Sequence, residues 1–70
     1  MEQKERETKR LHVFNSLFVG VQLGLRFART YGDFLNLFEY EMKNEVGDYT
    51  EEDELWAYKI LEDYEKKNAL

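Results

Sequence analysis

The sequence contains no cysteine, no proline and a single histidine among its 70 residues. Without cysteine there are no disulfides or thiolate metal sites, and one histidine does not supply the usual histidine-rich metal sites. Without proline, nothing in the chain forbids long unbroken helices. A domain of this size is marginal alone, so good helix packing or oligomerisation is expected to stabilise it.

Charge is distributed unevenly along the chain. Residues 1–31 carry six basic and three acidic groups, whereas residues 32–70 carry four basic and twelve acidic groups. The acidic half repels nucleic acid and anionic lipid and suits a basic partner. The sequence therefore predicts no direct nucleic-acid binding.

The most apolar stretch of the chain is LHVFNSLFVGVQLGLRFARTY, at residues 11–31. Polar side chains form only a narrow strip when this stretch is wound as a helix. Such a helix must be covered on several sides, which predicts a long central helix over residues 3–31. Its apolar residues recur with helical spacing and predict one buried stripe: Phe14, Leu17, Phe18, Val21, Leu25 and Ala28.

Residues 1–10 are expected to form a charged, solvated and frayed start of this helix, because residues 2–10 contain no large apolar side chain. Acidic residues interrupt the basic ones, which argues against a signal peptide. The longest uncharged run, Leu11 to Leu25, is shorter than the roughly 20 residues of a membrane span. These features predict a soluble, cytoplasmic protein.

Two shorter amphipathic helices are predicted over residues 33–46 and 50–68. Together with the first helix they make one all-α domain of three helices, which occupies residues 1–70. The apolar positions of the two shorter helices follow helical spacing and are expected to face inward: Phe34, Leu37, Phe38 and Met42 in the second, and Trp56, Ala57, Ile60, Leu61 and Tyr64 in the third.

Capping residues are expected to separate these helices. Gly32 and Gly47 are candidates for the left-handed position that follows a helix end. Asp33 is a candidate N-cap for the second helix. Thr50 with Asp53 resembles a capping box at the start of the third helix, although aspartate replaces the preferred glutamate or glutamine.

Small residues recur at every fourth position of the long helix, a spacing that lets another helix approach closely. Two glycines inside a helix cost about 1 kcal/mol each relative to alanine, and close packing is expected to offset this cost. The stripes of the two shorter helices cannot cover all of the first helix, which predicts a helical homodimer with this helix at its centre. The interface is predicted to contain Ser16, Gly20, Gly24, Phe27 and Ala28.

No arrangement of residues in the chain predicts catalysis. His12 and Ser16 lie one helical turn apart, but a serine within a helix lacks an oxyanion hole and a strained turn. The acidic run at residues 51–54 lacks the residue order of a calcium loop, and no glycine-rich phosphate loop is present. The sequence therefore predicts no enzyme activity, no metal site and no cofactor.

The acidic half combines carboxylates with tyrosines, a mixture that is typical of contact surfaces. The composition is similar to that of short acidic regulators, including those that phages use against host proteins. The predicted function is therefore to bind, and to regulate or inhibit, a protein with a basic surface, such as a nucleic-acid-binding protein that the acidic surface blocks by mimicking DNA. The predicted binding surface consists of Glu39, Tyr40, Glu41, Glu45, Asp48, Tyr49, Glu51, Glu52, Glu54 and Tyr58.

The alternative function is that of a helical adaptor or oligomerisation module. In that case the apolar face of the first helix packs against a helix of the partner. The two mechanisms differ in their response to salt, because exposed charges are screened over about 10 Å at 0.1 M salt whereas apolar docking hardly changes.

Overall fold

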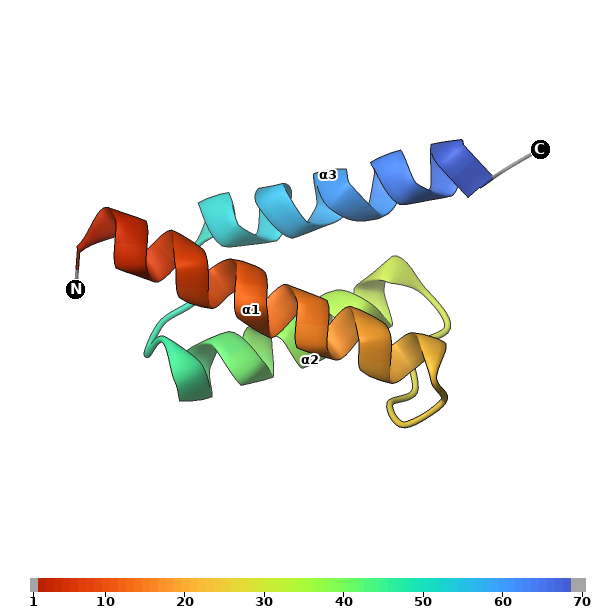
Figure 1. The fold of residues 1–70 in the computed structure, drawn as a ribbon, viewed down its shortest axis with the longest axis horizontal. Helices are drawn as coiled ribbons and strands as arrows, with labels where there is room; N and C mark the ends of the chain where they lie inside the picture. Colours follow the sequence, from red (N-terminus) through yellow and green to blue (C-terminus); the bar gives the residue numbers. More distant parts are fainter. Residues whose placement is uncertain (1, 69–70) are drawn as a thin grey trace.

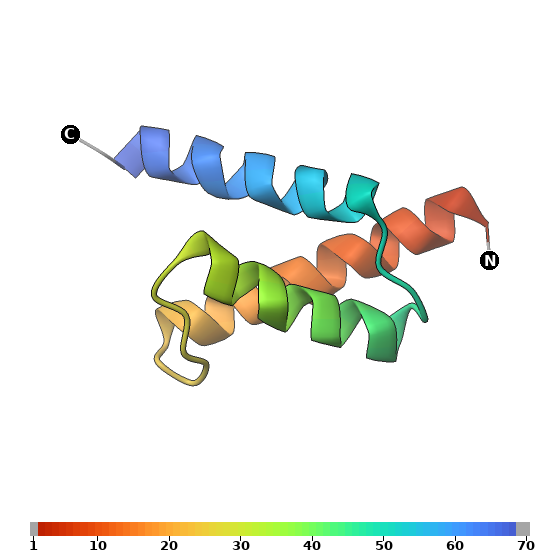
Figure 2. The ribbon, with the colours of Figure 1, turned by 180° about the vertical axis from the view of Figure 1, so that it is seen from behind.

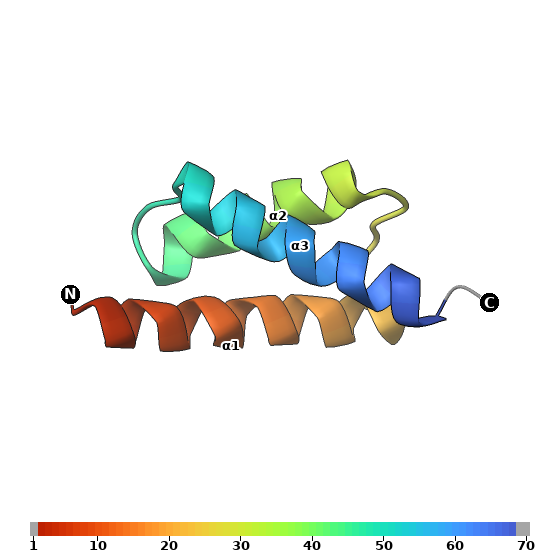
Figure 3. The same ribbon diagram turned by 90° about the horizontal axis from the view of Figure 1, so that it is seen from above.

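The protein folds into three α-helices over residues 2–68, the part of the chain that the computed structural model describes: α1 (Gln3–Gln22), α2 (Tyr31–Glu45) and α3 (Glu51–Asn68) (Figure 1). No strand occurs among these residues, and the predicted all-α class is confirmed. Figure 3 shows α1 along one side of the molecule, with α2 and α3 together on the other side. Figure 2 shows the view of Figure 1 from behind, with α2 in front of α1 and α3 above them.

The first helix ends at Gln22, well before the end predicted from apolar periodicity. Gly24 adopts a left-handed conformation with φ of 78°. The backbone N–H of Leu25 donates to the carbonyl of Gly20 at 2.8 Å, and the N–H of Gly24 donates to that of Val21 at 3.2 Å. These two bonds form a Schellman motif, which terminates a helix. The predicted extent of the first helix was wrong because apolar residues continue at helical spacing beyond this stop.

The second helix begins directly after Thr30, whose hydroxyl accepts a hydrogen bond from the backbone N–H of Asp33 at 3.1 Å. The Asp33 carboxylate in turn accepts from the backbone N–H of Arg29 at 3.1 Å. Gly32 therefore lies inside α2, and the predictions that Gly32 ends a helix and that Asp33 is the N-cap were wrong. Gly47, with φ of 111°, follows the C-cap of α2 as predicted.

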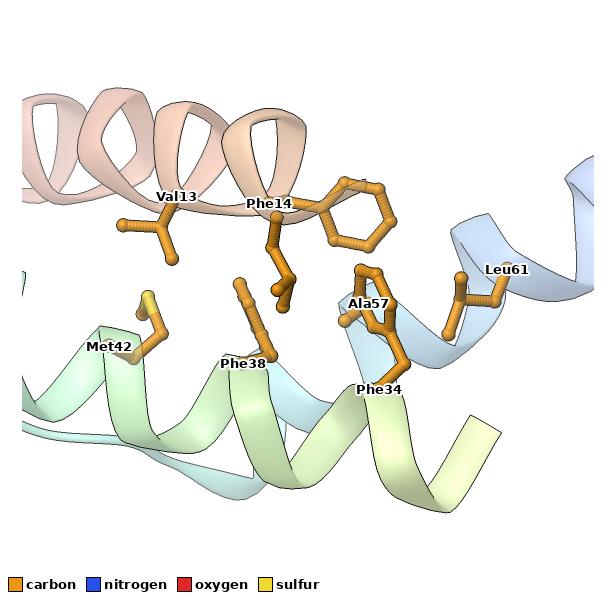
Figure 4. Packing of buried hydrophobic residues seen from close by; sticks show 8 residues of the cluster. Val13, Phe14, Phe34, Phe38, Met42, Ala57 and Leu61 are labelled. Carbon is orange, nitrogen blue, oxygen red and sulfur yellow. The ribbon is translucent and has the colours of Figure 1, made fainter. Parts of the chain in front are cut away.

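Aromatic side chains from α1, α2 and α3 meet at the centre of the core. The ring of Phe14 lies 5.2 Å from that of Phe34 and 5.4 Å from that of Trp56. Figure 4 shows the buried side chains of α1 facing those of α2, with Ala57 and Leu61 of α3 beside them. The buried apolar residues, all but one of which lie on the predicted stripes, are Val13, Phe14, Leu17, Phe34, Phe38, Met42, Ala57 and Leu61.

The outer face of α1 is left uncovered by the other helices. Leu11 and Val19 on this face are 48% and 50% exposed. Helices α2 and α3 therefore bury one side of α1 and leave the other to solvent. No helix within residues 2–68 combines the length and the apolar character needed to cross a membrane.

Candidate partner-binding surfaces

A cluster of ion pairs holds the first half of α1 against the start of α3. Asp53, whose side chain is fully buried, accepts hydrogen bonds from Arg6 at 2.8 and 2.6 Å and from Arg10 at 3.1 Å. The N–H of Thr50 donates to the same carboxylate at 2.9 Å, and the Asp53 N–H donates to the Thr50 hydroxyl at 3.3 Å. The predicted capping box is therefore confirmed. The Arg10 guanidinium also lies 4.4 Å from the ring centre of Trp56.

The cluster keeps its carboxylate ionised. Burial alone raises the pKa of Asp53, but the hydrogen bonds from Arg6, Thr50 and Arg10 outweigh burial and hold this pKa well below its usual range. Arg6 also binds Asp48 at 2.6 Å. The prediction of a solvated segment was therefore wrong for Arg10, which is buried, and for Arg6, which is mostly covered.

Three carboxylates of the predicted acidic surface form ion pairs within the chain. Glu39 pairs with Lys43 at 2.8 Å, as its helical spacing suggests. Glu41 pairs with Arg26 at 3.2 Å, and Asp48 pairs with Arg6 at 2.6 Å. Their negative charge is thus partly neutralised before any partner arrives.

The remaining carboxylates of that surface are more accessible. Glu45, Glu51, Glu52 and Glu54 are exposed, and no basic side chain of residues 2–68 lies within ion-pair distance of them. Leu55, adjacent to Glu54 in α3, is 63% exposed. The start of α3 therefore presents unpaired negative charge beside an apolar side chain.

The predicted tyrosine anchors differ in accessibility. Tyr40 is 64% exposed, and Tyr58 is 41% exposed with its ring 5.4 Å from that of Tyr31. Tyr49 instead packs edge-on against Phe38 at 5.8 Å, and burial raises the pKa of its hydroxyl. Tyr49 therefore belongs to the edge of the core, whereas Tyr40 and Tyr58 are available for contact.

The small residues of the predicted dimer interface do not form one helical line. Gly24 and Ala28 lie beyond the end of α1, while Ser16 is exposed within it. A Cβ atom at Gly20 would lie 3.0 Å from Cγ of Arg26, so the side chain that approaches Gly20 closely comes from the following loop. A Cβ atom at Gly24 would have no neighbour within 4 Å. Close helix packing along this line is therefore absent within residues 2–68, and the homodimer stays a prediction.

The loop between α1 and α2 exposes three large apolar side chains within five residues. Leu23 is 68% exposed, Leu25 is 76% exposed and Phe27 is 73% exposed. We call these three residues the apolar loop patch. The prediction that Leu25 lies on a buried stripe was wrong, because the helix ends before it. No signal in the helical periodicity alone distinguishes this patch from a buried helix face.

A polar hollow of about 170 Å³ lies between α1 and α2 and is lined in part by His12, Ser16, Arg26, Glu41 and Glu45. Within the described residues, no hydrogen bond joins His12 to Ser16, although a nucleophile and its base need such a bond. Histidine and carboxylate side chains also do not gather into a set of three that could hold a metal ion, as far as the described chain extends. The predicted lack of catalysis remains an expectation.

Comparisons with protein-family models, with curated proteins and with solved structures give no match to this chain. A functional interpretation therefore depends on the surfaces of the chain itself. Two surfaces stand out, namely the apolar loop patch and the unpaired carboxylates at the start of α3.

Proposed function

We propose that this chain is a non-enzymatic interaction protein that binds another protein through the apolar loop patch. The observation that carries the proposal is the exposure of Leu23, Leu25 and Phe27, each more than two-thirds accessible. Burying a side chain of this size contributes about 1.5–3 kcal/mol. Clustered apolar side chains left in solvent are typical of interaction sites.

The loop that carries this patch is fixed to the helices at both ends. The Schellman motif around Gly24 defines its start, and Thr30 caps the helix that follows. Between them, Arg26 covers Gly20 and pairs with Glu41 of α2. A fixed loop loses little conformational entropy on binding, which supports its use as a docking surface.

The proposal is tested by affinity capture from the native cell, identification of the retained protein, and affinity measurement with that protein purified. Replacing Leu25 and Phe27 by serine should abolish retention, and retention by the wild-type chain should survive a high-salt wash. Leu55→Ser is the matched control, because Leu55 is similarly exposed but lies on α3. Equal retention by the double variant and the wild type would refute docking through the loop.

The acidic surface is the second candidate, as a mimic of DNA that blocks a basic protein. It is favoured by the exposure of Glu51, Glu52 and Glu54, which have no basic partner in residues 2–68. Changing these three residues to lysine should abolish binding by this mechanism. Loss of the captured protein in high salt would favour it over docking through the loop, because exposed charges are screened.

The predicted homodimer is a separate proposal that concerns the outer face of α1. Leu11 and Val19 are half-exposed there, and Ser16 lies between them in the sequence. Closed two-fold dimers are the commonest assembly, and such a dimer would cover this face. Sedimentation equilibrium at high micromolar concentration tests it; a folded monomer there would contradict it.

A further inference from the structure

An apolar groove of about 300 Å³ lies beside the apolar loop patch, where α1, the loop, α2 and α3 come together. This volume is at the lower limit for small-molecule sites and is also enough for a large side chain of a partner protein. The hydrogen bond between Gln22 and the Tyr64 hydroxyl, at 3.0 Å, joins α1 to α3 at this groove. The apolar walls are provided by Phe18, Val21, Ala28, Phe34, Leu61 and Tyr64.

The edge of this groove carries a cation that forms no ion pair within residues 2–68. Arg29 lines the groove, and its guanidinium lies 5.2 Å from the ring centre of Phe27. In the described part of the chain, no carboxylate lies within ion-pair distance of this guanidinium. Arg6, Arg10 and Arg26, by contrast, all have carboxylate partners.

The α1 and loop side of the groove belongs to a long stretch of the sequence that carries no negative charge. No acidic residue occurs between Thr8 and Gly32 in a chain that contains 15 aspartates and glutamates. Glu65 of α3 accepts a hydrogen bond from the Tyr31 hydroxyl, a bond that raises the pKa of Tyr31 to about 12. The groove is therefore apolar inside, with the Arg29 cation on its loop side and the Glu65 carboxylate on its α3 side.

We propose that this groove receives an apolar side chain from an acidic amphipathic helix of a partner protein, and that Arg29 pairs with a carboxylate next to that side chain. The inference rests on docking through the apolar loop patch and adds the chemistry of the partner. An amphipathic helix presents an apolar anchor and a charged neighbour one turn apart. A charge-assisted hydrogen bond at the edge of an apolar site strengthens binding and selects the sign of the partner's charge.

Other occupants fit the surface less well. A small anionic amphiphile that fills the groove leaves Leu23, Leu25 and Phe27 uncovered, because none of them lines it. An anionic membrane is a broad surface that would meet the carboxylates of Glu62 and Asp63 on α3 at the same time as Arg29, whereas a single partner helix can lie along the loop side of the groove, where Arg29 is. A protein segment is large enough to contact the apolar loop patch and the groove together.

The experiment sorts a display library of helical peptides, with acidic, neutral and basic members, against the immobilised chain. The wild type should enrich acidic amphipathic peptides that carry a large apolar residue. Arg29→Glu should bind these peptides about tenfold more weakly, as expected for the loss of a charge-assisted hydrogen bond. Lys59→Glu is the matched control, since Lys59 is an exposed cation of α3 that does not line the groove. This variant should bind the enriched peptides with the affinity of the wild type.

The site is located by NMR titration of the wild type with an enriched peptide, in which the methyl signals of Val21, Ala28 and Leu61 should shift. The inference would be overturned if the enriched peptides showed no preference for acidic residues. It would also be overturned if they bound Arg29→Glu and the wild type with equal affinity. The proposed function would stand in that case if the Leu25→Ser, Phe27→Ser double variant had failed to retain the protein that the wild type captures from the native cell. Failure to enrich any peptide would overturn the inference, as would displacement of the peptide by octanoate or by phosphatidylglycerol vesicles.

Discussion

The two ends of α1 differ in the kind of side chain that is buried and the kind that is exposed. In its first half, the charged residue Arg10 is only 7% exposed and faces the fully buried Asp53 of α3. Just after its last turn, Leu25 and Phe27 are 76% and 73% exposed. Charged residues are usually outside and large apolar residues are usually inside, so each end reverses the common distribution.

The difference between the ends lies in where the compensating groups come from. At the first end, Arg6, Arg10 and Thr50 satisfy the buried carboxylate from within the chain. At the second end, the described residues leave Leu25 and Phe27 mostly exposed, and the Arg29 guanidinium lies over only one side of the Phe27 ring. The first reversal is therefore a feature of folding, whereas the second supports the proposal that another molecule completes this surface.

Removing the central carboxylate should have the largest effect on stability. Asp53→Ala leaves two guanidinium groups without their shared partner and also removes the cap contact with Thr50, which should destabilise the fold by about 3–5 kcal/mol. Thermal and urea unfolding followed by circular dichroism measure this. Asp63→Ala, at an exposed position, should change stability by less than about 0.5 kcal/mol. Equal effects of the two substitutions would show that the cluster does not stabilise the fold.

Lowering the pH should reduce the stability that Asp53 contributes at the contact between α1 and α3. Because the pKa of Asp53 is held below its usual range in the folded state, its contribution is present above the unfolded pKa of about 3.9 and is lost as pH falls further. The stability difference between the wild type and Asp53→Asn should therefore narrow as pH is lowered from 5 towards 2. Urea unfolding at several pH values tests this, and a difference that is constant over this range would contradict it.

The end of α1 should respond to the backbone conformation of its glycine. Gly24→Ala places an alanine in a left-handed backbone conformation and should destabilise the fold by about 1 kcal/mol, although its Cβ would touch no neighbour. Gly32→Ala is the matched control, because Gly32 lies inside α2 and its Cβ would meet only the Thr30 hydroxyl at 3.6 Å. The control should be neutral or slightly stabilising. Unfolding curves that rank the two variants in the opposite order would show that the Schellman motif is unimportant.

The smallest effect on stability is expected for the apolar loop patch. Replacing Leu25 and Phe27 by serine should change the free energy of unfolding by about 0.5 kcal/mol or less, because exposed side chains bury little area. Leu17→Ala, at a buried position of α1, should cost about 2–5 kcal/mol. Chemical unfolding measures both variants. A large loss of stability in the serine variant would mean that the patch supports the fold rather than binding.

Much of the fold could be predicted from local patterns in the sequence. The inward faces of α2 and α3 follow the helical spacing of residues such as Phe38 and Ala57, and the Thr50–Asp53 cap and the Glu39–Lys43 pair each join residues three or four positions apart. The end of α1 was missed because Leu25 and Ala28 continue the periodicity beyond Gly24. Glycine inside an apolar run is compatible with both a helix interior and a helix end.

The sequence by itself determined the helical class, the two later helices with their caps at Thr50 and Gly47, and the acidic character of the second half. These properties depend on composition and on contacts within about one helical turn. Only the tertiary structure decided that Arg6 and Arg10 bind Asp53, and that Arg29 lies at the edge of a groove without a carboxylate partner among residues 2–68. Charge pairing between distant positions depends on how the helices pack, and that packing is not encoded in any local pattern.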